Sequence, residues 1–226
     1  MDPEVPAVPT RLIDAPTSAT ASAAATLLLA HGAGAPMDSL FQAAIAAGLA
    51  ERGWRVVRFE FPYMARTRIT GRRHGPDRMP VLQEAFREQV RRERSEQPDH
   101  PLLLAGKSMG GRVASLVLDE LAASAGVLGC LCLGYPFHPP GKPGQLRTEH
   151  LAALQTPALI LQGERDSFGR REEVETYTLS PQVQLQWIPS GDHSFRPTRS
   201  SGRSEEQNLA LAVELSDAFL RQRLTG

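Results

Sequence analysis

Short, almost uninterrupted runs of apolar residues alternate along this chain with longer stretches in which polar and apolar positions are mixed. Such apolar runs predict strands buried on both faces, as in a parallel sheet that helices cover. The predicted strands are Leu27 to Ala30, Trp54 to Phe59, Leu102 to Ala105, Leu128 to Leu133, Ala158 to Gln162 and Val183 to Ile188. The predicted helices are Ser39 to Arg52, Pro80 to Glu96, Gly110 to Ala123 and Glu205 to Arg223. The pattern predicts an α/β fold with a mostly parallel central sheet and helices on both of its faces.

One domain is expected behind an irregular N-terminal arm. The 226 residues, 41% of them hydrophobic, suffice for one sizeable core. Residues 1–24 are rich in Pro, Ala, Ser and Thr, which favours a loose arm or an irregular edge strand near Leu12, and residues 25–226 are expected to form the domain. Two connections are long, a basic one at 61–79 and one rich in Pro and Gly at 134–144. Both are expected to line a ligand crevice.

Composition and the first residues indicate which classes of partner and which cellular compartment to expect. Lys plus Arg and Asp plus Glu both total 25, so the net charge is zero and nothing drives the chain toward nucleic acid or an anionic membrane. The first residues lack the basic region of a signal peptide, and the apolar stretch near them is too short to span a bilayer, which favours a cytoplasmic setting. Cys130 and Cys132 lie two apart in an apolar run and are expected to be core residues.

The segment Gly106-Lys107-Ser108-Met109-Gly110 joins a predicted strand to a predicted helix. This context is typical of a nucleophile elbow, in which a serine lies on a strained turn above the sheet. Glycine on either side removes Cβ atoms that would collide with neighbouring backbone. The N–H of Met109, at the start of the helix, is placed to stabilise a developing oxyanion. Ser108 is therefore the predicted nucleophile.

Two nucleotide-binding motifs share part of these glycine patterns but fit less well. The triplet Gly-Lys-Ser also ends a phosphate-binding P-loop, but Pro101 stands where that loop needs a glycine. The segment HGAG at 31–34 begins like a dinucleotide-binding fingerprint, but Met37 stands where the third glycine belongs. The same segment fits an oxyanion loop better, because its small residues leave the N–H of Ala33 accessible to a ligand.

An acid and a histidine follow Ser108 in the order that a Ser-Asp-His triad requires. Asp166 comes just after the strand predicted at 158–162, and His193 just after the one at 183–188. Asp192 and Glu164 are alternatives for the acid, but Asp192 is adjacent to the histidine, which usually directs its carboxylate away, and Glu164 lies closer to the strand. Five other histidines are expected to be structural or surface residues: His31, His74, His100, His138 and His150.

In this order the motifs resemble those of a known family. HGAG at 31–34, GKSMGGR at 106–112, GERD at 163–166 and GDHSF at 191–195 are similar to motifs of small α/β-hydrolase-like proteins. These are related to the testis-expressed hydrolase-like proteins, to a subunit of the non-specific-lethal chromatin complex and, more broadly, to dienelactone-hydrolase-like proteins. The resemblance covers about residues 24–224. It implies an α/β-hydrolase fold without a large lid domain and a triad of Ser108, Asp166 and His193. Dienelactone hydrolases typically carry a cysteine nucleophile, where this chain has serine.

The sequence thus predicts a serine hydrolase that cleaves carboxylic esters or thioesters through an acyl-enzyme. His193 would take the proton of Ser108, Asp166 would orient the imidazole, and the N–H groups of Met109 and Ala33 would hold the oxyanion. No cofactor and no metal ion are expected, because the sequence has no cluster with metal-ligand spacing. A small-molecule ester is the expected partner, and the sequence leaves room for a protein partner or a homodimer.

Two further hypotheses concern binding. Four arginines of the basic connection are candidates to bind a substrate carboxylate or phosphate: Arg66, Arg68, Arg72 and Arg73. The simpler interpretation is a loop whose charges face solvent. The alternative function is a catalytically weak hydrolase-fold subunit that binds other proteins, as the resemblance implies for some relatives.

Overall fold

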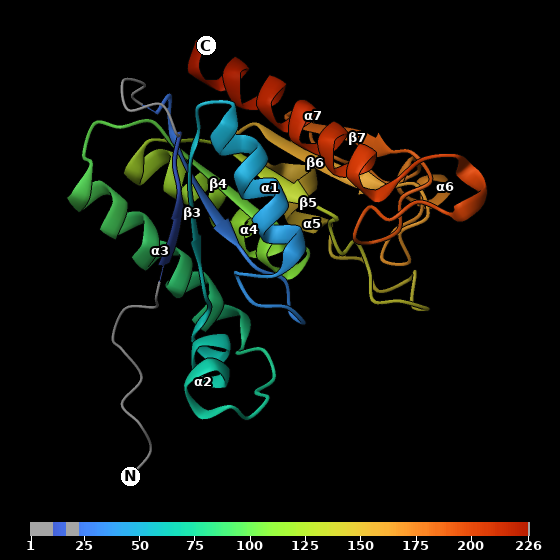
Figure 1. Ribbon diagram of the computed structural model, residues 1–226, viewed down its shortest axis with the longest axis horizontal. Coiled ribbons are helices and arrows are strands. Elements are labelled where there is room, and N and C mark those ends of the chain that lie inside the picture. Colours follow the sequence, from blue (N-terminus) through green and yellow to red (C-terminus); the bar gives the residue numbers. More distant parts are fainter. Residues whose placement is uncertain (1–10, 17–22, 226) are drawn as a thin grey trace.

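The computed structural model describes residues 11–16 and 23–225, which form a seven-stranded sheet in the order β1-β3-β2-β4-β5-β6-β7 (Figure 1). Strands β2 to β7 are parallel, and β1 pairs antiparallel with β3 at one edge. The strands are β1 (Arg11–Asp14), β2 (Thr26–Ala30), β3 (Arg55–Phe59), β4 (Leu102–Lys107), β5 (Val127–Leu133), β6 (Ala158–Gly163) and β7 (Val183–Ile188). The order reverses direction between β2 and β4, which is where ligands bind in open α/β sheets.

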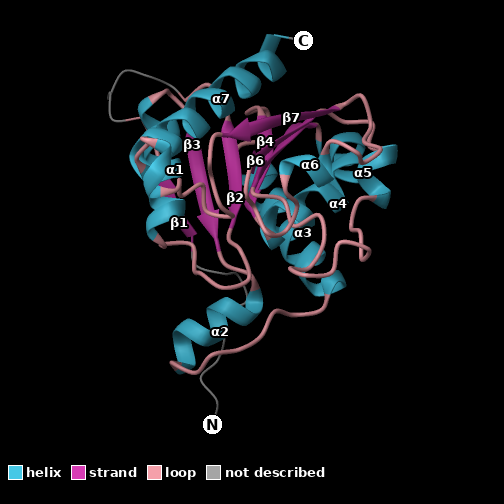
Figure 2. Ribbon diagram, turned by 90° about the vertical axis from the view of Figure 1, so that its right-hand side faces the viewer, coloured by secondary structure: helices cyan, strands magenta, loops and turns pink. Residues whose placement is uncertain are grey.

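Helices cover both faces of this sheet (Figure 2). On one face α1 and α7 pack together, and Ile45 and Leu220 from these helices join the core below the strands. On the other face lie α3 and α4, which contribute Phe86 and Val113 to a second core. The helices are α1 (Leu40–Glu51), α2 (Pro62–Thr70), α3 (Met79–Glu96), α4 (Met109–Ala125), α5 (Glu149–Ala153), α6 (Arg171–Val174) and α7 (Glu205–Thr225), with a 3₁₀ turn at Arg199–Ser201.

Burial along the strands follows from this layering. All residues of β2 and of β4 are buried, because helices cover both faces of the central strands. In β7, at the other edge, burial alternates, with Gln184 and Gln186 exposed. The apolar runs therefore predicted the strands correctly, and the expected α/β class with a mostly parallel, helix-flanked sheet is confirmed.

Helix α2 was missed by the apolar pattern, which placed a loop over 61–79. Its sequence has no apolar stripe, and its mean hydropathy is low because it carries two arginines and two threonines. Pro62 stands at its first position and Gly71 ends it with φ 67°. The N–H of Tyr63, in the first turn, donates to Asp77 Oδ2 at 2.8 Å. A carboxylate fourteen positions later in the chain thus accepts from a free N–H at the start of the helix. No local sequence pattern indicates this contact.

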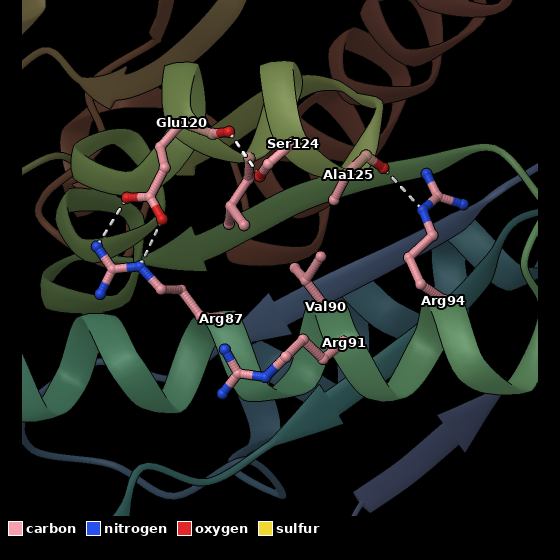
Figure 3. Close-up of a pocket in the computed structure, with 8 residues that line it drawn as sticks. Arg87, Val90, Arg91, Arg94, Glu120, Ser124 and Ala125 are labelled. Carbon is pink, nitrogen blue, oxygen red and sulfur yellow. Dashed lines mark hydrogen bonds and ion pairs between the residues drawn. The ribbon is translucent and has the colours of Figure 1, made fainter.

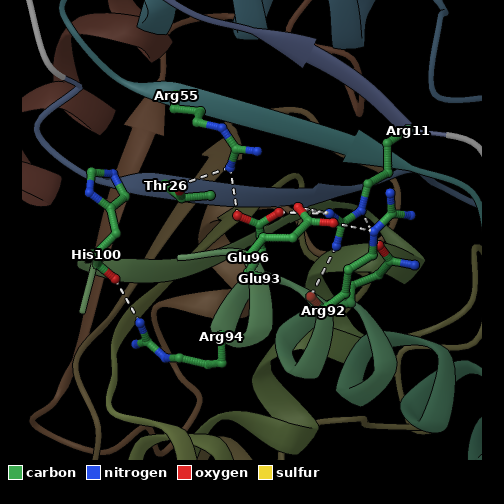
Figure 4. A network of polar contacts seen from close by, with 9 residues as sticks. Arg11, Thr26, Arg55, Arg92, Glu93, Arg94, Glu96 and His100 are labelled. Atoms are coloured by element: carbon green, nitrogen blue, oxygen red, sulfur yellow. Dashed lines mark hydrogen bonds and ion pairs between the residues drawn. The ribbon is translucent and has the colours of Figure 1, made fainter. Parts of the chain in front are cut away.

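Edge strand β1 belongs to the segment expected as an irregular arm, and a buried polar network fastens it to α3 (Figure 4). Glu93 of α3 accepts from Arg11 at 2.7 Å through one carboxylate oxygen and from Arg55 of β3 at 2.6 Å through the other. Glu93 is 2% exposed, so loss of either arginine would leave part of a buried charge uncompensated. The rest of the arm, residues 1–10 and 17–22, lies outside the described residues.

Candidate active site

Ser108 lies between β4 and α4 in a backbone conformation that side-chain-bearing residues rarely adopt. Its φ is 52° and its ψ is −115°, and such a conformation costs on the order of 1–3 kcal/mol. Its N–H donates to the carbonyl of Leu133 in the neighbouring strand at 3.0 Å, which helps to hold the turn. A Cβ on Gly110 would lie 2.6 Å from the carbonyl oxygen of His31, so glycine is required there for this close approach. This is the geometry of a nucleophile elbow.

His193 and Asp166 are brought together from the loops after β7 and β6. The imidazole Nδ1 lies 2.7 Å from Asp166 Oδ2, and Asp166 is fully buried. Two more donors reach this carboxylate: the Phe168 N–H binds Oδ1 at 2.9 Å, and Gln162 Nε2 binds Oδ2 at 2.9 Å. Asp166 therefore has three hydrogen-bond donors around it. As an acceptor, it fixes the imidazole tautomer with the proton on Nδ1, which leaves Nε2 as an acceptor.

The surroundings of His193 also favour a neutral imidazole. Burial lowers the pKa of His193, and the charge of Lys107 lowers it further, against the opposing effect of Asp166. The ring of Phe168 packs on the imidazole with 4.3 Å between ring centroids and 31° between planes. A neutral imidazole whose Nε2 carries no proton is what a general base needs near neutral pH.

Lys107 contacts the backbone of the histidine. Its ammonium donates to the backbone carbonyl of His193 at 2.5 Å, and its side chain is buried. Gly134 leaves room for this contact, because a Cβ there would lie 2.7 Å from Lys107 Nζ. Burial lowers the pKa of Lys107 to about 8, against the opposing charges of Asp166 and Asp192. This lysine thus anchors the loop that carries His193 and places a positive charge behind the imidazole.

Two backbone segments meet beside Ser108. Met109 is the first residue of α4, so its N–H has no acceptor within the helix and adds to the positive end of the helix dipole. The loop after β2 lies against the elbow, since a Cβ on Gly32 would lie 3.6 Å from Ser108 Cβ. Ala33 is the next residue of that loop. The two segments expected to supply oxyanion donors are therefore adjacent in space.

A cavity of about 850 Å³ opens at this point. Ser108, His193, Gly32 and Ala33 all line it. Its walls are largely apolar and come from the loop after β2, the start of α1, the loop after β6 and the start of α7: Ala35, Leu40, Phe41, Ala44, Phe168 and Leu209. Its mouth carries an ion pair between Arg196 and Glu205. An apolar cavity with a few convergent polar groups is the usual form of a small-molecule site.

Another hollow, of about 550 Å³, lies between α3 and α4, on the other face of the sheet (Figure 3). Its arginines are largely engaged: Arg87 pairs with Glu120 at 2.8 Å and Arg91 pairs with Glu84 at 2.7 Å. None of the residues predicted from the sequence to carry chemistry lines it. The catalytic candidates gather in the 850 Å³ cavity instead.

None of the four arginines of the basic connection lines the cavity that holds Ser108. Arg66 pairs with Asp77, and Arg68 pairs with buried Glu60 at 2.6 Å and with Asp38 at 3.0 Å. Arg72 is exposed. Arg73 lines a second cavity, of about 400 Å³, which shares Ala33 and Gly34 with the first. Carboxylates therefore engage two of the four arginines, and the substrate contacts expected for them stay a prediction.

Residues that competed for the catalytic roles make other contacts. Glu164 accepts from the Ser190 N–H at 2.8 Å and pairs with Arg171, and Asp192 accepts from the N–H groups of its own turn. Each of these carboxylates stabilises a loop, whereas Asp166 contacts the imidazole. Among the histidines, His150 binds Ser115 Oγ at 2.9 Å and has a pKa lowered to about 4, chiefly by burial.

Sequence reasoning missed two polar residues that support the site. Gln162, the polar end of an otherwise apolar strand, is fully buried and binds Asp166. Asn208 of α7 is also fully buried, and its side-chain amide donates to the carbonyls of Phe195 and Pro189 on either side of the His193 turn. A polar residue at the end of an apolar run was the available signal for Gln162, since such residues are buried only with hydrogen-bond partners.

Comparison with known proteins places this geometry in a family. The model of the alpha/beta hydrolase domain family matches residues 23–221, and the chain belongs to that family. Among solved structures, a serine hydrolase without a lid from Xanthomonas campestris is 22% identical, with a TM-score of 0.64, and the match covers 95% of this chain and 97% of that one. A dienelactone hydrolase from Anabaena variabilis is 18% identical, with a TM-score of 0.69 and coverage of 97% and 94%. The esterase domain of a Rhodothermus marinus protein is 20% identical, with a TM-score of 0.63 and coverage of 93% and 91%.

The comparisons confirm the predicted α/β-hydrolase fold and the resemblance to dienelactone-hydrolase-like proteins, and they identify the chain as a hydrolase-family protein. Over residues 11–16 and 23–225, no helix is long and apolar enough to cross a membrane. In the same part of the chain, no group of three or more His, Cys, Asp or Glu side chains is arranged to hold a metal ion.

Proposed function

We propose that this protein is a serine hydrolase that cleaves carboxylic esters, or thioesters, through an acyl-enzyme formed on Ser108. One observation carries the proposal: a serine in an elbow conformation and a histidine hydrogen-bonded to a buried carboxylate line the same cavity. The family and the esterase domain among the structural neighbours support the same class of reaction.

In the first half of the reaction, Ser108 Oγ attacks the acyl carbon while His193 Nε2 takes the hydroxyl proton. The carbonyl π electrons move to the oxygen, which becomes an oxyanion. The tetrahedral intermediate then collapses, the bond to the leaving oxygen or sulfur breaks, and the imidazolium gives its proton to the departing alcohol or thiol. Asp166 stabilises the imidazolium and holds its tautomer through the 2.7 Å bond.

Water completes the cycle by the reverse sequence of proton transfers. His193 takes a proton from a water molecule, whose oxygen attacks the acyl carbon, and the proton then returns to Ser108 Oγ as the acid leaves. In both halves, the N–H groups of Met109 and Ala33 are the proposed donors to the oxyanion. Removal of one such donor typically lowers kcat by about 10²–10³.

The cavity walls indicate the kind of ester. Phe41, Leu40 and Leu209 present apolar surface, and Leu40 is 89% exposed at the start of α1. Burial of apolar surface contributes about 25 cal/mol per Å², so this wall favours a substrate with an uncharged, apolar group. An anionic substrate is the alternative, for which Arg196 at the mouth of this cavity and Arg73 in the neighbouring cavity supply positive charge.

Labelling with a fluorophosphonate, measured by intact mass, tests the proposal. Wild-type protein is expected to gain one adduct, and Ser108→Ala to gain none, because the reagent reacts only with an activated serine. Ser115→Ala is the matched control: Ser115 also contacts a histidine, but it is buried outside the cavity, so the variant should label like the wild type. Folded wild-type protein that gains no adduct would contradict the proposal and favour the alternative of a protein-binding subunit.

A further inference from the structure

The hydroxyl of Tyr63 contacts the loop after β2 from the side of α2. It lies 3.2 Å from the carbonyl oxygen of Gly32 and 3.1 Å from that of Ala33, and its side chain is fully buried. Both carbonyls therefore accept from a single O–H group. Burial also raises the pKa of Tyr63 above its usual value, so the hydroxyl keeps its proton.

His31 holds the same loop with a second donor. The N–H of Phe61 donates to His31 Nε2 at 3.0 Å, so the imidazole proton must be on Nδ1. His31 Nδ1 lies 2.7 Å from the carbonyl oxygen of Gly32 and donates to it. Burial lowers the pKa of His31, which keeps this ring neutral and its tautomer fixed. The Gly32 carbonyl thus accepts hydrogen bonds from two side chains, those of Tyr63 and His31.

Because the peptide group is planar, hydrogen bonds that fix the Gly32 carbonyl also fix the direction of the Ala33 N–H. In a trans peptide, the C=O and the N–H point in opposite directions, and no cis bond occurs in residues 11–16 or 23–225. A Gly32 carbonyl directed at Tyr63 and His31 therefore directs the Ala33 N–H away from them. Ala33 lines both the cavity beside Ser108 and the neighbouring cavity, and of the two the cavity beside Ser108 holds the candidate nucleophile.

We propose that Tyr63 is a positioning residue for hydrolysis, whose buried hydroxyl holds the peptide groups at 32–34 so that the Ala33 N–H is aimed at the oxyanion formed on Ser108. The inference rests on the proposed serine-hydrolase function and adds a residue that touches neither the substrate nor the triad. Tyr63 is itself held at its backbone, because its N–H donates to Asp77 at 2.8 Å and its carbonyl accepts from Thr67 at 2.9 Å.

The test compares two conservative variants with p-nitrophenyl acetate as the substrate. Tyr63→Phe removes only the hydroxyl, and since His31 still holds Gly32, kcat is expected to fall about tenfold rather than by the full loss of an oxyanion donor. Acylation and deacylation both pass through an oxyanion and should slow by the same factor. KM should therefore stay unchanged. Tyr135→Phe is the matched control, because Tyr135 is equally buried and its hydroxyl donates to the Arg147 carbonyl, outside the cavity.

A second measurement separates positioning from general loss of structure. Benzeneboronic acid forms a tetrahedral adduct on an active serine, so its inhibition constant should rise about tenfold in Tyr63→Phe, in step with the fall in kcat. Tyr135→Phe loses an equivalent hydrogen bond and should show a similar drop in Tm with unchanged kcat and inhibition constant. An active wild type with unchanged kinetics in Tyr63→Phe would overturn this inference alone. Wild-type protein that neither hydrolyses the ester nor binds the boronic acid would overturn the proposed function as well.

Discussion

Asp166→Asn gives the sharpest test of the triad, because every hydrogen bond to the carboxylate is defined. Phe168 donates to Oδ1, while Gln162 and His193 both donate to Oδ2. An asparagine side chain offers one oxygen and one NH₂ group. With its NH₂ at the Oδ2 position, it faces two donors, and His193 can pair with it only by moving its proton to Nε2. With its NH₂ at the Oδ1 position, it meets the backbone N–H of Phe168.

Each arrangement has a measurable consequence. A buried donor without an acceptor costs about 1–3 kcal/mol of stability. In the first arrangement the shifted tautomer cannot take a proton from Ser108, and in both arrangements a neutral amide no longer stabilises the imidazolium; the corresponding change in serine proteases lowers kcat about 10⁴-fold. We expect kcat/KM for p-nitrophenyl acetate to fall by about 10³–10⁴, which is about 4–5.5 kcal/mol in activation free energy.

Glu164→Gln is the matched control for this experiment. It removes a carboxylate two residues away that contacts Ser190 and Arg171 but not His193, so activity should change by less than about threefold. If Asp166→Asn keeps activity within tenfold of the wild type, Asp166 is not the orienting acid. Activity lost in both variants would point to a general disturbance of the loop after β6.

Two other predictions concern pH and packing. Because burial lowers the pKa of His193, the acid limb of kcat/KM should have its midpoint below pH 6.5, the usual pKa of a histidine. Lys107→Met removes a charge that also lowers this pKa, so its acid limb should move to higher pH, and an identical pH profile would refute the electrostatic role of the lysine. Gly110→Ala forces a Cβ to within 2.6 Å of the His31 carbonyl, so it should lower the free energy of unfolding in urea by more than about 4 kcal/mol or prevent folding. Gly144→Ala, whose Cβ would meet nothing within 4 Å, should stay within about 0.5 kcal/mol of the wild type, and equal effects of the two changes would contradict the packing argument.

Local patterns predicted the strands and the residues placed at their ends. Ser108 was predicted as the nucleophile because its glycines stand in a strand-turn-helix context, and His193 as the base because it follows the last apolar run. Parallel strands carry their carboxyl ends to one edge of the sheet, so knowledge of the strands was enough to expect these residues near one another. Asp166 was chosen over its neighbours by position, and its contact with His193 agrees with that choice.

Features that depend on contacts between distant segments could not be found in this way. Tyr63 reaches a loop thirty residues earlier, and the helix that carries it is stabilised by Asp77 rather than by an apolar stripe. Lys107 was weighed only as the lysine of a possible P-loop, although it anchors the backbone of His193. Such roles follow only from the three-dimensional arrangement, because neither residue type nor spacing distinguishes them from surface residues.

The way the site is distributed over the sheet has a consequence for folding. The candidate catalytic groups follow four different strands: β2, β4, β6 and β7. Long crossovers separate these strands along the chain, so the groups approach one another only when strands distant in sequence have paired. Pairing of this kind gives a high contact order and slow folding. His193 lies in the loop after β7, so the proposed hydrolysis requires β7 to have joined the sheet. Hydrolytic activity would therefore report completion of the whole fold rather than of any part of it.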